Sequence, residues 1–441
     1  MSTVEKIYSA IVTRSPQAAE DMPDEVQRHI PSNGLRQVVG HALQSSGDQI
    51  VNASTVLPWL FAVLGVPTSL TGVLVPIRES GSMLPQAFLT PLVLRVKHRK
   101  WVFVTGALIQ AASVAFMAGT AALAEGLTAG ILIISALAAF SLGRCLGSIS
   151  SKDVQGRTIP KGERGQITGL ATTASGIVAI TLGLAIRIFG GESLSAGELA
   201  LMLSGGAVLW VLVALVYASI NEPADEGDAD SSDDSSNWFS SMVALLRDDD
   251  VFHRFVLVRS LLLVSALSPP FIVTMSIQRG SNVLVGLGGF VIASGLAALI
   301  GGRLFGRFAD RSSRRLMSIG AGLASAIIVA VVVAVSLPGF DGNSWVGTVV
   351  FILGYFLLRL THTGVRVARK TYIVDMAEGD TRTTYTAVSN TAMGIILLLV
   401  GAISSAIAAF GIIWALLVLA ALGLVGVFAG GTLPDVSAKP E

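Results

Sequence analysis

Long apolar runs alternate with short polar segments along the chain after residue 36. Twelve of these runs are about 20–25 residues long, and at 1.5 Å per residue a helix of that length crosses the roughly 30 Å interior of a bilayer. The pattern therefore predicts an all-α polytopic membrane protein with twelve transmembrane helices. The predicted spans are Gln37–Gly65, Ser69–Val93, Trp101–Ala124, Thr128–Ser150, Gln166–Phe189, Ala196–Ile220, Phe252–Ile277, Val283–Phe305, Leu316–Leu337, Trp345–Val367, Tyr385–Ala409 and Ile412–Gly430.

An acidic segment separates the sixth span from the seventh. Asn221–Ser236 carries seven acidic residues among Ser and Gly, a composition that favours a solvated linker over a packed core. The chain then divides into an N-terminal extension (1–36), a first six-helix bundle (37–220), an acidic cytoplasmic linker (221–250), a second six-helix bundle (251–431) and a cytoplasmic tail (432–441).

The two predicted bundles share an internal repeat. At one constant offset, five positions of the first match the second: Lys152, Arg164, Thr168, Thr173 and Gly176 fall on Lys370, Arg382, Thr386, Thr391 and Gly394. A shared offset across the connection between the fourth and fifth helices is typical of two homologous, pseudo-symmetric bundles.

Composition supports the membrane assignment and excludes several other classes. Of the 441 residues, 52% are hydrophobic and 13% are charged, and the mean hydropathy is +0.71, which is more apolar surface than one soluble core can hide. The basic residues are spread over loops, so no nucleic-acid-binding face is expected. Cys145 is the only cysteine, which excludes an internal disulfide and a cysteine-cluster metal site.

Lys and Arg set the expected orientation. Only Arg187 and Arg279 of the 30 basic residues fall on the side opposite to most of the others, and cytoplasmic loops are normally the basic ones. The first thirty residues contain no apolar core of a signal peptide. We therefore expect both termini in the cytoplasm, with an amphipathic helix around Val4–Val12 on the membrane surface.

Polar side chains interrupt the first two spans. Asp48, Asn52 and Thr55 recur at spacings of four and three, so they share one face of the first helix. The second span carries Arg78 and Glu79 near its middle. These adjacent residues project about 100° apart on a helix, so each needs a different partner.

Other polar residues lie inside later spans. Counted at 1.5 Å per residue, Arg144 of the fourth span lies at about the depth of Asp48, which predicts an ion pair between them. Arg359 lies near mid-depth, whereas Arg259 and His362 lie near span ends. An arginine there can snorkel, so we expect a structural use for Arg259, and we expect hydrogen bonding for His362. The polar residues of the second bundle are Arg259, Tyr355, Arg359, His362 and Asn390.

These residues allow two interpretations, a static network that holds helices together or the lining of a polar cavity with a proton relay. A charge at mid-membrane costs about 2.5–3.5 kcal/mol, more than the roughly 0.6 kcal/mol that a polar contact returns, which favours the cavity for Arg78 and Glu79. For Asp48 and Arg144 both interpretations stay open. The sequence has no Gly-rich phosphate loop, Ser/His/Asp grouping or His-Glu-x-x-His motif, so we expect neither an enzyme nor a cofactor or metal.

A short basic turn lies in the second bundle at Gly302–Arg315. It contains the pattern Gly306-x-x-x-Asp310-Arg311-x-x-Arg314-Arg315, which resembles the loop signature that transporters of the major facilitator superfamily carry between the second and third helices of a six-helix half. In the first half, Arg99 and Lys100 match the last two residues of this pattern, but Arg95 stands where the acid is expected.

This resemblance implies a central cavity between the bundles, lined mainly by helices 1, 4, 7 and 10, and alternating access by rocking of the bundles. The expected function is proton-coupled secondary active transport of a small polar or anionic solute by a monomeric permease of the cytoplasmic (inner) membrane. The residues assigned to it are Glu79 and Asp48 for proton coupling, Asn52, Thr55, Arg78, Arg144, Tyr355, Arg359 and Asn390 for the substrate cavity, and Gly302, Gly306, Asp310, Arg311, Arg314 and Arg315 for the cytoplasmic gate.

Other functions of the same fold stay open, namely a lipid flippase, a drug or metabolite exporter, or a sensor that binds without moving solute. Proton-coupled drug export is not the first choice. Those exporters carry a Gln three residues after an Arg of the fourth helix, whereas Gly147 follows Arg144, and the Gly-Pro pair of their fifth helix is absent from Thr168–Phe189.

Overall fold

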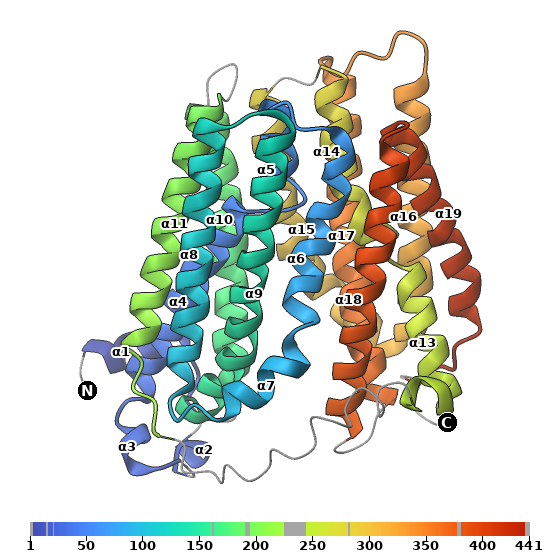
Figure 1. Ribbon diagram of the computed structural model, residues 1–441. Coiled ribbons are helices and arrows are strands. Elements are labelled where there is room, and N and C mark those ends of the chain that lie inside the picture. Colours follow the sequence, from blue (N-terminus) through green and yellow to red (C-terminus); the bar gives the residue numbers. More distant parts are fainter. Residues whose placement is uncertain are drawn as a thin grey trace.

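The computed structural model describes residues 3–14, 16–20, 22–160, 163–189, 195–224, 244–280, 283–376 and 381–436, and all regular structure in these residues is helical. Long helices stand side by side, and the two ends of the chain lie at the same end of the molecule (Figure 1). We call this the terminal end and the opposite one the far end. Chain ends on one side agree with the even number of crossings that the sequence predicts.

The N-terminal bundle consists of the helices from α4 to α11, preceded by three short helices. Within it, α8 packs against α9 and α11, while α4 packs against α10 and α11 and α6 packs against α9. The helices are α1 (Thr3–Ile11), α2 (Pro16–Glu20), α3 (Asp24–Gln27), α4 (Ile30–Ile50), α5 (Val56–Val63), the 3₁₀ helix η1 (Thr68–Val73), α6 (Leu74–Met83), α7 (Gln86–Leu94), α8 (Arg99–Leu123), α9 (Gly126–Thr158), α10 (Arg164–Phe189) and α11 (Ala196–Ala218).

The C-terminal bundle consists of the helices from α13 to α19. Its α17 packs against α14, α15 and α16, and its α19 packs against α13, α14, α16 and α18. The helices are α13 (Asp250–Leu261), α14 (Val264–Gln278), α15 (Val283–Arg311), α16 (Ser313–Ser336), α17 (Trp345–Met376), α18 (Thr381–Ala408) and α19 (Ile412–Gly431).

Eight helical segments of the described chain are long and apolar enough to cross a membrane, and they coincide with eight of the twelve predicted spans. Shorter apolar stretches lie in α10 and α15. The first two predicted spans are not continuous helices: the first breaks at residues 51–55, and the second is divided into η1, α6 and α7. The count of twelve therefore stays a prediction. The eight segments are Arg99–Leu123, Gly126–Thr158, Ala196–Ala218, Asp250–Gln278, Ser313–Ser336, Trp345–Ile373, Val388–Ala408 and Ile412–Gly431.

Glycines let the two bundles approach each other closely along two lines. On one line α10 packs against α15, and a Cβ atom placed on Gly176 would lie 2.4 Å from the side chain of Leu299. On the other line α6 and η1 pack against α18, where the Ser80 hydroxyl donates a 2.7 Å hydrogen bond to the carbonyl of Gly394. Small residues at such contacts are what allows membrane helices to pack closely.

The hydrophobic cores divide differently at the two ends of the molecule. One large core joins the N-terminal bundle to the far-end parts of the C-terminal bundle and includes Trp59 and Phe271. Toward the terminal end, the C-terminal bundle has its own core around Phe255, and the N-terminal side has a separate core around Tyr8. Within the described residues, apolar packing therefore seals the bundles together at the far end and leaves them separate at the terminal end.

In each bundle, a basic residue at the start of the third predicted span binds the last helix at the terminal end. In the N-terminal bundle, Lys100 of α8 donates a 2.8 Å hydrogen bond to the carbonyl of Ile220, just after α11. In the C-terminal bundle, Arg314 of α16 donates one, also of 2.8 Å, to the carbonyl of Leu433, just after α19. A cation there satisfies carbonyls that the helix end leaves without partners.

Glu222, at the start of the predicted acidic linker, packs against the N-terminal bundle. Its side chain is buried, and it accepts hydrogen bonds from the backbone N–H groups of Arg99 (3.1 Å) and Lys100 (2.8 Å), so it caps the N-terminus of α8. Burial raises the pKa of Glu222 above its usual value, and the two N–H groups act in the opposite direction. The remainder of the linker at 225–243 lies outside the described residues.

The N-terminal extension packs against the bundle. The predicted amphipathic helix is confirmed as α1, and Tyr8 of α1 is buried against Gly34 and donates a 2.7 Å hydrogen bond to Glu163. Contact with the membrane surface stays a prediction. The exposed apolar side chains of α1, which are Val4, Ile7 and Ile11, suit such a contact.

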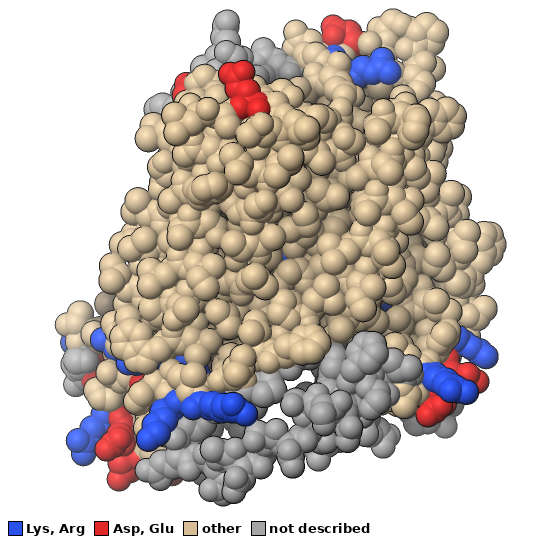
Figure 2. Space-filling model, viewed as in Figure 1, with Lys and Arg blue, Asp and Glu red and all other residues tan. Residues whose placement is uncertain are grey.

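Charged side chains gather at the two ends of the molecule on the face drawn in Figure 2, and the broad belt between them is almost free of charge. This is the distribution that a protein surface needs where it contacts hydrocarbon. On this face the belt therefore presents almost no charge to the hydrocarbon.

Candidate functional site

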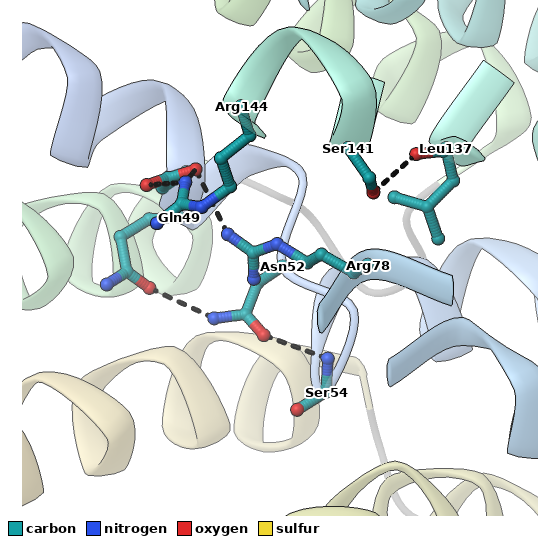
Figure 3. A network of polar contacts seen from close by, with 8 residues as sticks. Gln49, Asn52, Ser54, Arg78, Leu137, Ser141 and Arg144 are labelled. Carbon is teal, nitrogen blue, oxygen red and sulfur yellow. Dashed lines mark hydrogen bonds and ion pairs between the residues drawn. The ribbon is translucent and has the colours of Figure 1, made fainter. Parts of the chain in front are cut away.

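Three charged side chains of the N-terminal bundle meet in one cluster (Figure 3). Asp48 lies in the last turn of α4, Arg78 in α6 and Arg144 in the middle of α9. One terminal nitrogen of Arg144 lies 2.5 Å from both carboxylate oxygens of Asp48, and a terminal nitrogen of Arg78 lies 3.0 Å from one of them. The predicted Asp48–Arg144 ion pair is confirmed, while the second guanidinium on the same carboxylate was not predicted.

The charges of this triad do not balance. One carboxylate faces two guanidiniums, so one positive charge remains. The side chains keep part of their surface accessible, 18% for Asp48, 13% for Arg78 and 33% for Arg144. The Nε atom of Arg78 is buried and has no hydrogen-bond partner among the described residues. The triad can therefore still donate to an anionic or polar group.

Local structure explains how α4 and α6 bring these side chains together. Asn52 accepts a 2.9 Å hydrogen bond from the backbone N–H of Ser54, and this short turn ends α4 and lets the chain restart as α5. On the other side of the triad, Gly81 of α6 packs against Ser141 of α9, so the two helices approach closely and Arg78 reaches Asp48.

Asn52 and Thr55 were predicted to line the cavity. The structure gives the Asn52 side chain a local role in the turn, since its amide also donates to the side chain of Gln49 at 3.4 Å. Thr55 is fully buried, and its hydroxyl has no hydrogen-bond partner among the described residues. Their role in binding stays a prediction.

Glu79 interacts electrostatically with cations of both bundles. These are Arg78 and Arg144 of its own bundle and Arg366 and Arg369 of α17. Arg78 forms its ion pair with Asp48 and not with its neighbour, as expected, and Glu79 is the carboxylate that interacts with the C-terminal bundle.

The predicted polar residues of the C-terminal bundle are divided between two places. Tyr355 and Arg359 lie on α17, where Tyr355 is buried edge-on to the ring of Phe290. Asn390 lies on α18 and accepts a 3.1 Å hydrogen bond from Arg259 of α13. Arg259 has the structural use expected of it, because it is 6% exposed and also donates to the hydroxyl of Ser389. Arg259 thus holds α13 to α18.

Two arginines that the sequence reasoning missed belong to the site. Arg366 and Arg369 fall at or beyond the end of the predicted tenth span and were counted with the basic cytoplasmic residues. The helix α17 continues to Met376, and both guanidiniums lie within electrostatic reach of Glu79. Their spacing from Arg359, seven and ten residues, puts all three on one helix face, and this was the signal that could have revealed them.

The side chains of most residues of the predicted gate are not described. Gly302, Gly306, Asp310 and Arg311 belong to α15, but their side chains are not described. Arg314 contacts the end of its own bundle at Leu433, and Arg315 is exposed in the first turn of α16. A gating role for these residues stays a prediction.

The chain was compared with known proteins. The model of the major facilitator superfamily matches residues 39–355, which is more than half of the chain. The protein belongs to the major facilitator superfamily. Together with its many apolar helices, this membership makes it a multi-pass membrane protein. A search of curated proteins finds no match.

Solved structures of several transporters are similar in fold to this chain. A D-xylose–proton symporter shows a TM-score of 0.70 at 12% identity, with 92% of this chain and 99% of that chain covered. A mutant of the nucleoside transporter NupG shows 0.68 at 14%, covering 91% and 99%. A peptide transporter POT in complex with sulfate shows 0.67 at 13%, covering 99% and 100%. At these identities the likeness concerns the fold.

Proposed function

We propose that this superfamily member is a monomeric secondary active transporter that moves a small polar or anionic solute across the cytoplasmic membrane by alternating access. The observation that carries the proposal is that charged groups of both bundles face one another in the interior. Asp48, Arg78, Glu79 and Arg144 come from one bundle and the arginines of α17 from the other. Charges at that depth are tolerable where they border water or a ligand.

The bundles 37–220 and 251–431 would rock as two units about this site. The apolar core that joins them at the far end and the separate cores at the terminal end support a state that is open toward the terminal end. With both termini in the cytoplasm, this is the inward-facing state. When the terminal end closes, Asp310 would approach the N-terminus of α10, where a carboxylate gains about 0.3–1 kcal/mol from unpaired N–H groups.

Protons would couple through Glu79 first and Asp48 second. Asp48 comes second because it already forms ion pairs with two guanidiniums, which its protonation would break. Glu79 has looser electrostatic contacts that span the two bundles, so its charge senses both their separation and the solute. Arg78, Arg144 and Arg359 would hold the solute.

The test begins with a thermal-shift screen of metabolites on the purified protein, because a ligand of the folded form raises its apparent stability. Hits are then followed in proteoliposomes. We expect Glu79→Gln to abolish proton-driven accumulation and to spare solute exchange, with the exposed Glu198→Gln as control. Unchanged uphill transport in Glu79→Gln contradicts the role of Glu79, and absence of flux for every bound solute contradicts transport and favours a sensor.

A further inference from the structure

Three arginines of α17 form a row, which we call the cation stripe and define as Arg359, Arg366 and Arg369. At 100° per residue they lie within about 80° of one another around the helix, with His362 on the same face. At 1.5 Å per residue the stripe is about 15 Å long and runs from the middle of α17 toward the terminal end.

The stripe faces the N-terminal bundle. Arg366 interacts electrostatically with Arg144 of α9 and Glu79 of α6, and Arg369 interacts with Glu79. Arg366 is exposed to solvent although protein atoms surround it, which places it on an internal surface that water reaches. This surface is the space between the bundles at the terminal end, where the hydrophobic cores are separate.

Positive charge dominates this surface. Five guanidiniums of the triad and the stripe face two carboxylates, Asp48 and Glu79, so three positive charges are uncompensated among the described residues. Lys370 of α17 and Arg259 of α13 add further positive charge nearby. The C-terminal bundle offers few acids, since the sequence of residues 251–431 contains only Asp310, Asp341, Asp375, Glu378 and Asp380.

A structural role does not account for the stripe. Arg259 shows what a structural arginine looks like in this bundle, because it is buried and donates to Ser389 and Asn390 on a neighbouring helix. Within the described part of the chain, no carboxylate forms an ion pair with Arg359, Arg366 or Arg369. Like charges spaced three and seven residues apart on one face repel each other, so the empty stripe is unfavourable.

We propose that the cation stripe, with Arg144 opposite, binds a small anion that carries at least two negative charges, of the dicarboxylate or phosphate class. The inference rests on the proposed function and deepens it by giving the charge of the solute. A guanidinium presents a planar pair of donors that matches a carboxylate or a phosphate group. A doubly charged anion offsets most of the uncompensated charge, which a neutral solute leaves in place.

The experiment measures binding to the full-length protein purified in detergent, at constant ionic strength in chloride. The probes are succinate, inorganic phosphate and sulfate as dianions, acetate as a monoanion and glucose as a neutral solute. We expect at least one dianion to raise the Tm and to bind more tightly than acetate or glucose. Arg366→Gln with Arg369→Gln weakens that binding by about tenfold or more, whereas the exposed Arg254→Gln of α13 leaves it unchanged.

Four results would overturn the inference: equal shifts for dianions and acetate, no shift with any dianion, binding that survives in the double variant, or competition by phosphatidylglycerol in mixed micelles without competition among soluble dianions. Binding and transport are separate readouts. Dianion binding without flux in proteoliposomes supports the stripe and contradicts the proposed transport. If the protein transports a neutral solute and binds no dianion, the result supports transport and contradicts anion binding by the stripe.

Discussion

The two bundles handle intramembrane charge in opposite ways. The N-terminal bundle brings Asp48 between Arg78 and Arg144, so its charges are held by ion pairs within one bundle. The C-terminal bundle carries three arginines along α17 for which the described residues provide no ion pair, and their principal acid, Glu79, belongs to the other bundle. The difference indicates that the N-terminal side of the site, which we call the prebuilt wall, is stabilised by its own ion pairs. The arginines of α17 on the C-terminal side obtain a counter-charge from the solute that binds there.

The largest expected effect concerns the prebuilt wall. Asp48→Asn leaves two partly buried guanidiniums without their carboxylate. Removal of one partner from a buried ion pair costs up to about 3–5 kcal/mol, and solvent access lowers that cost. We expect a loss of up to that size in denaturant unfolding of the detergent-purified protein, with the exposed Asp248→Asn as control. A variant as stable as the parent would show that Asp48 does not hold this wall together.

The next effect concerns the contact that joins the two bundles. A Cβ atom on Gly401 of α18 would lie 2.1 Å from the ring of Pro76 in α6, and the rigid ring cannot yield. Gly401→Val should cost about 1–3 kcal/mol in the state described and shift the population toward opening at the far end. Spin-label distances across the far end should lengthen, with Gly119→Val, which meets nothing within 4 Å, as control. Unchanged distances would contradict a seal along this line.

A smaller effect compares the end caps of the two bundles. Lys100→Gln removes a charge that caps the end of α11, and Arg314→Gln removes one that caps the end of α19, each worth about 0.3–1 kcal/mol. Both variants should lower the Tm slightly and equally. A marked loss for one variant alone would show that the bundles do not close their terminal ends in the same way.

The smallest effect on stability is expected in the cation stripe of α17. Arg366→Gln removes a cation that has no ion pair among the described residues and lies beside other cations, so the free energy of unfolding should change by about 0.5 kcal/mol or less. Denaturant unfolding without added anion measures this. A loss comparable with that of Asp48→Asn would erase the distinction between the two sides of the site.

The sequence allowed much of the architecture to be predicted, because hydrocarbon imposes the length and polarity of each span. Depth counting also found the Asp48–Arg144 pair. It could not find that Arg78 joins the same carboxylate, since a long flexible side chain reaches partners that helix register does not specify. The break at residues 51–55 was missed because its cause is a local hydrogen bond of Asn52 and not a change in hydropathy.

The sequence analysis missed the cation stripe because the predicted tenth span ends at Val367. Arg366 and Arg369 near the end of a predicted span are indistinguishable from ordinary cytoplasmic bases by the positive-inside rule. Only the length of α17 and the position of Glu79 on another helix show that they face the interior. Arg259 is the contrasting case, because it was expected to have a structural use and is buried against α18. Tertiary packing decides both cases.

The central claim is that charged groups of both bundles line one wet chamber that holds the solute. The most direct measurement places a single cysteine in this chamber, as Arg366→Cys in a protein whose buried Cys145 is replaced by alanine. We predict that a charged, membrane-impermeant thiol reagent labels this site from the terminal end of the molecule and that a bound solute slows the labelling. A site that stays unlabelled from the terminal end, or that reacts at the same rate with and without solute, would contradict the account.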